Sequence, residues 1–318
     1  MDIIYNDVFL QHDTGMHPEN KKRLEAFNEI PQTEIPHSED YLEIVHTKEY
    51  IQRVKDSCNP GGHLDQDTVV SPRSFEAAVK AVNATVMASE NGDFALVRPP
   101  GHHAYPGHSS GFCLFNNVAI ATQKLVNENQ KVLIFDFDGH LGDGTSKIFN
   151  STDKVMYWSL HQYPAFPGGG NADEIGEGNG NGFTINVPLP STGGDDIYLE
   201  AVKRFMPIAL QFDPDVVAIS AGFDSHQYDL LLDLRLTMNA YYETGKILRD
   251  NFKRMFATLE GGYNVEILHK CVTNFLNGIN GEKMTYEERG TDSRIMTIDE
   301  FEHRMDALDR NLKPYWNI

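Results

Sequence analysis

The sequence predicts an α/β fold in which a largely parallel sheet carries helices on both faces. Apolar runs of strand length alternate along the chain with longer segments whose apolar residues recur at helical spacing. The 318 residues are 40% hydrophobic, which is enough to bury a large core, and no obvious linker divides them. The ligand site of such a fold lies beyond the carboxyl ends of the strands. We therefore expect one domain over residues 1–318, with its site at the strand ends.

The N-terminal half supplies two expected strands and four expected helices. In the helix expected at 71–90, apolar residues from Phe75 to Val86 follow one face, and Ser71 is a candidate cap. A loop rich in proline and glycine, residues 98–111, precedes the last helix, and loops of this kind often hold sites. In chain order we expect a strand at 2–5, helices at 20–28, 48–56 and 71–90, a strand at 94–97 and a helix at 115–127.

The C-terminal half continues the alternation of strands and helices. Pro207 is expected to kink the helix at 195–212. The polar residues from about 280 to 318 are expected to form a packed helical appendage. In chain order we expect a strand at 132–136, a helix at 146–150, strands at 155–160 and 183–187, a helix at 195–212, a strand at 216–220, a helix at 236–252 and a strand at 255–259.

The composition argues against several classes of protein. A formal net charge of −19 disfavours nucleic-acid and anionic-membrane partners and favours cationic ligands, although many soluble proteins are acidic for solubility alone. The cysteines Cys58, Cys113 and Cys271 form no CxxC pair, so neither a disulfide framework nor a thiolate zinc cluster is expected. The first residues lack a signal-peptide pattern, and no stretch approaches 18 uninterrupted apolar residues. We therefore expect a cytoplasmic location.

Polar groups follow five of the expected strands. At the richest junction, Asp136, Asp138 and His140 end an apolar run and Asp143 follows in a glycine-rich turn. Side chains alternate along a strand, so the first three of these residues point to the same side. Two carboxylates and an imidazole crowded together favour a divalent metal as their partner. The other four junctions are residues 98–103, 159–161, 221–224 and 260–263.

Asp138 and His140, with Asp224 from a later strand end, form a candidate metal site. Oxygen and nitrogen donors that leave room for water and substrate are typical of catalytic zinc. Asp138 and Asp224 could instead cap the helices that follow them, a frequent duty of Asp at such turns. Helix capping would explain either aspartate by itself, but it explains poorly why so many polar residues occur together at the strand ends.

His102, His103 and Tyr263 are candidates for proton transfer and oxyanion stabilisation. Imidazole titrates near neutral pH, and a carboxylate such as Asp136 or Asp143 would fix its tautomer and raise its pKa. Tyr263 follows two glycines, which let the backbone turn a phenol inward as a hydrogen-bond donor. The alternatives are that the histidines are merely exposed in their loop and that the aromatic ring serves packing.

Five motifs carry most of these candidates. They are Arg98-Pro-Pro-Gly-His-His-Ala104, Gly111-Phe-Cys-Leu-Phe-Asn-Asn117, Asp136-Phe-Asp-Gly-His-Leu-Gly-Asp-Gly-Thr145, Ser220-Ala-Gly-Phe-Asp-Ser225 and Glu260-Gly-Gly-Tyr263. Together they resemble the histone deacetylase superfamily, specifically the class II-like deacetylases and the acetylpolyamine amidohydrolases. The resemblance runs from about His12 to Tyr263 and implies a three-layer α/β/α arginase-deacetylase fold with a central, mostly parallel, eight-stranded sheet.

The resemblance also implies roles for the residues already named. One zinc ion per chain is implied, with three ligands: Asp138, His140 and Asp224. Five residues are implied to carry the chemistry of a metal-dependent amidohydrolase: the proton-transferring His103 and its helper His102, their respective carboxylate partners Asp143 and Asp136, and Tyr263, which would polarise the acetyl carbonyl.

A narrow channel for the acyl-amine stem is implied as well, with Phe112 and Phe166 as its aromatic walls and Gly111 beside the stem. Asp67 resembles the acid at the channel rim that holds the substrate. The neighbouring Asp65 is an alternative, and either acid could simply be solvated. Similar proteins bind potassium at two places, which here would involve Asp136, Ser159 and Leu160 with Asp138 and His140, and Phe149, Thr152 and Val155.

The chain departs from the family pattern at Leu141, where a second His is usual. The missing histidine is not a metal ligand, so we expect zinc to bind. We expect the residues around the zinc ligands to influence the ion differently from those in the rest of the family. The residues Ser109 and Ser110, before the channel position Gly111, are more polar than usual, which would alter the channel mouth.

The predicted function is a zinc-dependent deacetylase that hydrolyses the acetyl, or another short acyl, amide of an aliphatic primary amine. The expected substrate is Nε-acetyl-lysine in proteins or an acetylpolyamine. One alternative is a catalytically weak, acyl-lysine-binding regulatory protein, motivated by Leu141. Another is a ureohydrolase of the same fold, which would need a binuclear manganese site with more ligands. No nucleic-acid or membrane partner is expected, and a homo-oligomer is left open.

Overall fold

A seven-stranded sheet lies at the centre of the computed structural model of the protein, which describes residues 1–27 and 29–318. All neighbouring strands of this sheet are parallel, in the order β1-β4-β9-β8-β5-β6-β7. The strands are β1 (Ile3–Ile4), β4 (Phe94–Ala95), β5 (Val132–Asp136), β6 (Val155–Gln162), β7 (Thr184–Leu189), β8 (Val216–Ala221) and β9 (Met255–Leu259). The predicted parallel α/β class is confirmed.

This sheet has one strand fewer than the eight that the resemblance implies, as far as residues 1–27 and 29–318 show. Two further short strands, β2 (Gly62–His63) and β3 (Val69–Val70), pair with each other in an antiparallel hairpin instead of joining it. Both residues of β2 are exposed, whereas β5, β6, β7 and β8 are buried along their whole length. A strand inside a parallel sheet must be covered on both faces, which an exposed Gly-His pair is not.

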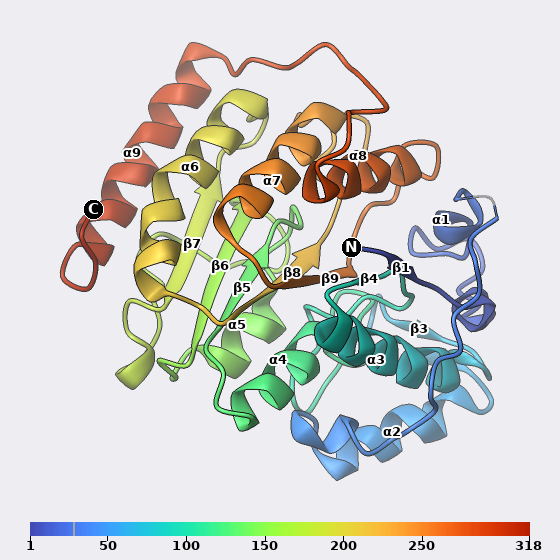
Figure 1. Ribbon diagram of the computed structural model, residues 1–318. Coiled ribbons are helices and arrows are strands. Elements are labelled where there is room, and N and C mark those ends of the chain that lie inside the picture. The colour runs from blue at the N-terminus through green and yellow to red at the C-terminus, as the bar shows by residue number, and fades with distance from the viewer. Residues whose placement is uncertain (28) are drawn as a thin grey trace.

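Helices cover both faces of the sheet and complete the three-layer arrangement. Figure 1 shows α6, α7, α8 and α9 on one face and α2, α3, α4 and α5 on the other. The helices are α1 (Lys22–Glu25), α2 (Lys48–Cys58), α3 (Ser74–Asn91), α4 (Asn117–Asn127), α5 (Asp143–Phe149), α6 (Asp195–Phe212), α7 (Met238–Asn251), α8 (Leu268–Asn280) and α9 (Ile295–Leu312). None of them, within the described part of the chain, has the length and apolarity needed to span a membrane.

Several helix boundaries differ from the prediction. α3 begins at Ser74, and the candidate cap Ser71 lies outside it, where its backbone N–H donates to the Ser74 hydroxyl. α5 begins at Asp143, directly after Gly142 and earlier than predicted. α1 is shorter than the helix expected at 20–28, and residue 28 itself lies outside the described residues. α6 keeps its predicted bounds and continues through its internal proline.

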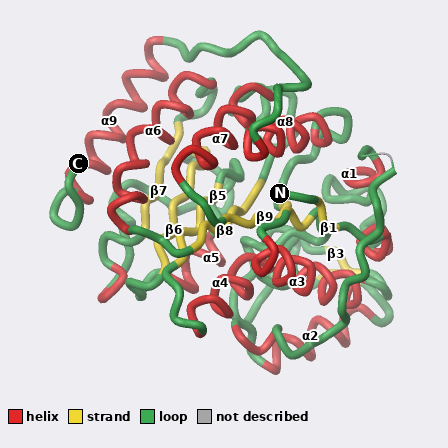
Figure 2. Tube along the Cα trace, in the orientation of Figure 1, coloured by secondary structure: helices red, strands yellow, loops and turns green. Residues whose placement is uncertain are grey.

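The segment predicted as a C-terminal appendage includes α9, which packs along the edge strand β7. Trp316 Nε1 donates to the Gly182 carbonyl at 2.6 Å, and Arg304 donates to the carbonyls of Tyr163 and Pro188. A covered edge strand does not offer unpaired backbone groups to another chain. The connection between α8 and α9 is a long loop that runs along the top of the molecule in Figure 2.

Candidate active site

The carboxyl ends of the strands bring the polar junctions to one edge of the sheet. Asp136 at the end of β5 pairs in register with Ser159 of β6 and with Ser220 of β8. β5 ends at Asp136, whereas β8 continues to Ala221 and β6 to Gln162. The site is built mainly from residues that follow β4, β5, β8 and β9 at this edge of the sheet.

The side chains of Asp138, His140 and Asp224 meet in a buried cluster. Nδ1 of His140 lies 2.9 Å from Oδ2 of Asp224 and 3.3 Å from Oδ1 of Asp138. Residues 1–27 and 29–318 contain no second group of three such side chains whose donor atoms lie within 4.8 Å of one another. Burial, and then the charge of Asp138, raises the pKa of the Asp224 carboxyl. Two carboxylates and one imidazole in a buried space suit a divalent cation.

Backbone N–H groups orient both carboxylates of this cluster. Oδ2 of Asp138 accepts from the Gly261 N–H at 2.8 Å, and Oδ1 of Asp224 accepts from the Gly139 N–H at 2.7 Å. A Cβ atom on Gly222 or Gly261 would overlap Oδ2 of Asp138. Glycine is therefore required where the backbone approaches the carboxylates.

The alternative that Asp138 and Asp224 cap the following helices is wrong. The N-cap of α5 is Gly142, which has no side chain. The N-cap of α7 is Thr237, whose hydroxyl accepts from the Asn239 N–H. Both carboxylates instead face the cluster.

Two histidine–aspartate pairs lie beside the cluster. Nδ1 of His103 lies 2.7 Å from Oδ1 of Asp143, and Nδ1 of His102 lies 3.2 Å from Oδ2 of Asp136. The structure thus brings together the pairs that the resemblance implied. A tyrosine hydroxyl donates to each aspartate: Tyr105 to Oδ2 of Asp143 at 3.0 Å and Tyr157 to Oδ2 of Asp136 at 2.9 Å.

The two histidines differ in protonation. Burial, and then the charge of His102, lowers the pKa of His103 to about 4, so its ring is neutral at pH 7. Burial opposes ionisation of Asp143, but hydrogen bonds from His103 and Tyr105 outweigh it and lower the pKa of that carboxyl. A neutral His103 beside an ionised Asp143 carries its proton on Nδ1, which leaves Nε2 as the acceptor. For His102, burial is outweighed by the charges of two nearby aspartates, which hold its pKa well above the usual value.

The turn that follows β9 directs Tyr263 into the site. Gly262 has φ +114°, in the region that favours glycine, and a Cβ there would crowd Leu268. Arg23 donates from Nε to the Gly262 carbonyl at 2.7 Å, and its guanidinium lies 5.0 Å from the ring centre of Tyr263. The Tyr263 ring also contacts Phe112 edge-on, with 5.6 Å between the ring centres.

A pocket of about 250 Å³ leads to these groups. Its walls are largely apolar, and the exposed Asp67 contributes an acid. Gly111 has φ +51°, and a Cβ there would overlap the His103 ring. All four substrate-binding residues named from the sequence line this pocket, together with Leu231, which was missed. The full lining is Asp67, His103, Gly111, Phe112, His140, Phe166, Leu231 and Tyr263.

The sequence profile of the histone deacetylase domain matches residues 17–279 of the chain. The chain belongs to the histone deacetylase family. It is 35% identical to a probable deacetylase of Archaeoglobus fulgidus, over 83% of this chain and 81% of that protein. It is 32% identical to a histone deacetylase-like amidohydrolase of Pseudomonas aeruginosa, over 83% of this chain and 76% of that protein.

The fold of a solved member of the family matches this structure closely. The crystal structure of the HDA15 HD domain gives a TM-score of 0.89 at 30% identity and covers 99% of this chain and 97% of that one. The seven-stranded sheet and its helices therefore form the arginase-deacetylase fold. The chain is a histone deacetylase-family hydrolase.

This deacetylase-family chain also contains a buried charge network that the sequence reasoning missed. The Glu19 carboxylate lies 3.1 Å from Nη1 of Arg23 and 2.8 Å from Nη2 of Arg98, and 3.4 Å from Nε2 of His12. Burial opposes ionisation, but the charge of Arg98 outweighs it and lowers the pKa of Glu19 well below its usual value. Through Arg23, this network supports the turn that carries Tyr263.

Glu260 is a second missed residue, although it lies in a motif that carries the family resemblance. Its Oε2 accepts from the backbone N–H groups of Gly101 at 2.6 Å and His102 at 3.1 Å, and its Oε1 accepts from the Ser220 hydroxyl. Burial raises the pKa of this carboxyl to about 7. Glu260 therefore holds the loop of residues 98–104, here called the histidine loop, against the sheet edge.

The two acids of the β2–β3 hairpin have different environments. Oδ2 of Asp65 accepts from the Ser109 hydroxyl, and its Oδ1 accepts from the backbone N–H groups of Asp67 at 3.0 Å and Thr68 at 2.8 Å. Asp65 therefore shapes the loop, and Asp67 is the acid that lines the pocket.

The potassium ligands named from the sequence stay predictions. The Asp136 side chain already accepts from Tyr157, and the Ser159 hydroxyl bonds to Nδ1 of His161 at 2.8 Å. Leu160 is buried beside them in β6. The second set consists of Phe149 at the end of α5, Thr152 in the connection and Val155 at the start of β6.

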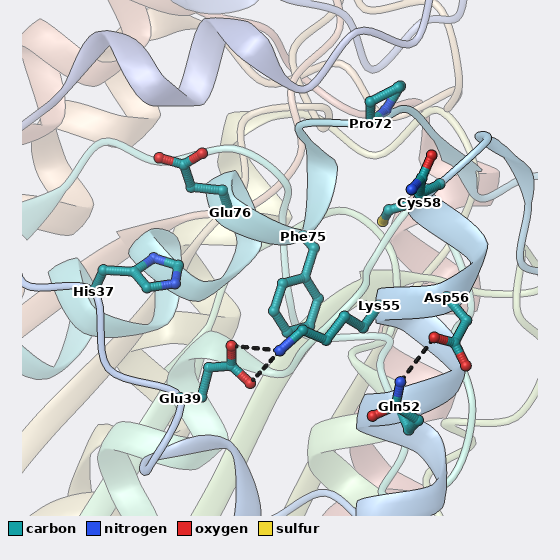
Figure 3. Close-up of a pocket in the computed structure, with 10 residues that line it drawn as sticks. His37, Glu39, Gln52, Lys55, Asp56, Cys58, Pro72, Phe75 and Glu76 are labelled. Atoms are coloured by element: carbon teal, nitrogen blue, oxygen red, sulfur yellow. Dashed lines mark hydrogen bonds and ion pairs between the residues drawn. The ribbon is translucent and has the colours of Figure 1, made fainter.

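A second, more open cavity of about 640 Å³ lies between α2 and α3. Figure 3 shows the ammonium of Lys55 paired with Glu39, and Gln52 bonded to Asp56, among its lining residues. Burial raises the pKa of Cys58 in this cavity to about 11, so its thiol stays protonated at pH 7. The cavity shares no lining residue with the pocket that contains His103 and Tyr263.

Proposed function

We propose that this chain hydrolyses the acetyl, or another short acyl, amide of an aliphatic primary amine, with one zinc ion held by Asp138, His140 and Asp224. The proposed substrates are Nε-acetyl-lysine in proteins and acetylpolyamines, which both present an amide on a slender stem. The observation that supports this function is the convergence of the His103 imidazole, the Tyr263 phenol and the ligand His140 on one pocket.

The pocket walls suit a slender aliphatic stem. The Phe166 ring lies 5.2 Å from the His103 ring, and the Phe112 ring lies 5.6 Å from the Tyr263 ring, measured between ring centres. Aromatic walls stabilise methylene groups by burying them, and they exclude water from the reacting amide.

His103 moves the proton in the proposed reaction. Its Nε2 accepts a proton from the attacking water and later donates it to the leaving nitrogen as the amide C–N bond breaks. Asp143 holds the Nδ1–H and stabilises the ring while it is charged. The charge of His102, whose ring centre lies 4.1 Å away, favours release of that proton from His103.

Tyr263 stabilises the negative charge that develops on the carbonyl oxygen, because its phenol donates a hydrogen bond there. When bound, zinc supplies Lewis-acid chemistry, which polarises a carbonyl and lowers the pKa of water. The buried carboxylates and imidazole of the cluster fit such an ion.

Neither alternative function is favoured. The similar proteins are named deacetylase and amidohydrolase, and Leu141, which motivated a catalytically weak acyl-lysine-binding protein, is buried in the core. A ureohydrolase needs ligands for two metal ions, and a single cluster of three occurs among residues 1–27 and 29–318.

Acetate release by zinc-loaded protein tests this function. The panel is an acetyl-lysine peptide, acetylputrescine and acetylspermidine, and turnover of at least one is expected. Tyr263→Phe should lower kcat about 10²- to 10³-fold, and His103→Ala should lower it by about 10²-fold or more. Tyr315→Phe, which removes an exposed phenol near the C-terminus, should leave kcat unchanged. Substrate binding without turnover, or full activity in the first two variants, would overturn the proposal.

A further inference from the structure

One carboxylate joins the Tyr263 turn to the loop that carries Leu231, and both Tyr263 and Leu231 line the pocket. Oδ2 of Asp229 accepts from the backbone N–H groups of Tyr263 at 2.6 Å and Asn264 at 3.1 Å. Oδ1 of the same side chain accepts from the N–H groups of Leu230 at 2.7 Å and Leu231 at 3.2 Å. Each carboxylate oxygen therefore accepts from the backbone of a different segment. One segment contains the pocket residue Tyr263 and the other contains the pocket residue Leu231.

Three apolar or aromatic side chains of the loop that carries Leu231 are exposed. Tyr228 is 58% exposed, Leu230 73% and Leu231 37%. A second hydrogen bond joins the same two segments: Nδ2 of Asn264 donates to the Tyr228 carbonyl at 2.7 Å. These bonds therefore join the exposed part of this loop to the Tyr263 turn.

The Tyr263 turn depends on the same bonds. Gly262, directly before Tyr263, has φ +114° and no side chain to restrict its backbone. Arg23 holds the carbonyl of Gly262, and Asp229 holds the N–H of the next residue. Without Asp229, the backbone N–H groups of Tyr263 and Asn264 lose their carboxylate acceptor.

We propose that Asp229 is a positioning residue of the reaction, which couples the phenol of Tyr263 to the pocket wall at Leu231. This inference rests on the proposed function for its kinetic consequences. Asp229 does not act on the substrate, because a carboxylate offers about four acceptor positions and four N–H groups use them. Its loss disturbs catalysis and recognition of the stem together.

Steady-state kinetics on the zinc-loaded full chain test the coupling through the phenol. Asp229→Ala is expected to lower kcat/KM for an acetyl-lysine peptide about 10²-fold, because a misplacement of about 1 Å has that cost. Asp229→Asn, which keeps one acceptor oxygen, should fall between this variant and the wild type. In a Tyr263→Phe background, Asp229→Ala should lower kcat by less than about threefold, because the phenol that it positions is already absent. Asp233→Ala removes an exposed acid from the same loop and should have no effect.

Amide hydrogen exchange tests the structural coupling whether or not the protein turns over substrate. In Asp229→Ala, residues 228–232 and 261–265 should lose protection together, while the histidine loop 98–104 keeps its own. Loss of protection in only one of the two segments, or full additivity of the Asp229→Ala and Tyr263→Phe effects on kcat, would overturn this inference. Absence of turnover in the wild type with both segments deprotected together would instead overturn the proposed function and leave the coupling standing.

Discussion

Nδ1 of His103 lies 2.7 Å from Oδ1 of Asp143, whose second oxygen accepts a hydrogen bond from the Tyr105 hydroxyl. The carboxylate is thus held from both sides, and the imidazole has one tautomer available when it is neutral. The free acceptor, Nε2, belongs to a ring that lines the pocket. The protonation state of His103 is therefore set by its buried partners before any substrate arrives.

Asp143→Asn is expected to lower kcat by about 10²-fold or more, because an amide NH₂ turned toward His103 favours the wrong tautomer. Tyr105→Phe removes only a neighbouring hydrogen bond and should cost about tenfold or less. Measurement of kcat at saturating substrate, with zinc content checked in each variant, tests this ranking. Equal losses in the two variants would contradict the role given to Asp143.

Gly261→Ala is expected to prevent metal binding, because its Cβ would overlap the oxygens of both Asp138 and Asp224. The matched variant is Gly107→Ala, where a Cβ would meet no atom within 4 Å. Zinc content per chain after dialysis and metal affinity by titration are the measurements. Full zinc content in Gly261→Ala would show that the ion does not depend on this geometry.

Removal of the metal should destabilise the protein, because an ion that binds only the folded state stabilises it by mass action. At a free zinc concentration about 1,000 times Kd, the free energy of unfolding should be about 4 kcal/mol larger than without metal. A chelator should therefore lower Tm, and added zinc should restore it. An unchanged Tm would argue against a zinc site in the folded chain.

Local patterns in the sequence account for the central strands and for the position of the site. β9 was predicted at its observed bounds and β8 within one residue, since a buried parallel strand is an apolar run with clear ends. Parallel pairing then brings strand ends to one edge, so Asp138 and Asp224 could be paired although they are far apart in sequence. The β2–β3 hairpin has only two residues in each strand, and the exposed β2 offers no such apolar run, so the hairpin was missed.

The missed residues depend on contacts between distant segments. Arg23 donates to the carbonyl of Gly262, 239 residues away, and Asp229 accepts from the N–H of a residue 34 positions later. Neither a buried arginine nor a carboxylate bound to backbone leaves a periodic signal in a short window. α8 is different, because Leu268, Val272, Phe275 and Ile279 follow helical spacing and would have predicted it.

Glu19→Gln is expected to lower the free energy of unfolding by about 3–5 kcal/mol, because it leaves two buried arginines without their carboxylate. The control is Glu43→Gln, which removes an exposed partner of Lys48 and should cost less than about 1 kcal/mol. Urea unfolding of both variants gives the comparison. Similar values for the two would contradict the account of the buried network.

Stability should fall in mild acid, in part through His46. Its Nδ1 lies 3.0 Å from the Tyr105 carbonyl, its Nε2 accepts from the Asn116 N–H at 2.9 Å, and burial lowers its pKa to about 4. Well above pH 6.5 the ring is neutral in both the folded and the unfolded chain, so its contribution is complete. Between about pH 6.5 and 4 only the unfolded chain binds the proton, and the folded state loses about 3 kcal/mol over that range.

His46→Gln should therefore make the free energy of unfolding less dependent on pH between 6.5 and 4, although the variant is less stable at pH 7. Gln supplies one donor and one acceptor, but it does not titrate. Urea unfolding at several pH values measures the slope for the wild type, for His46→Gln and for His63→Gln, which removes an exposed imidazole. If His46→Gln keeps the slope of the wild type, another group must carry the acid sensitivity. The buried His161, whose pKa burial also lowers to about 4, would be the next to test.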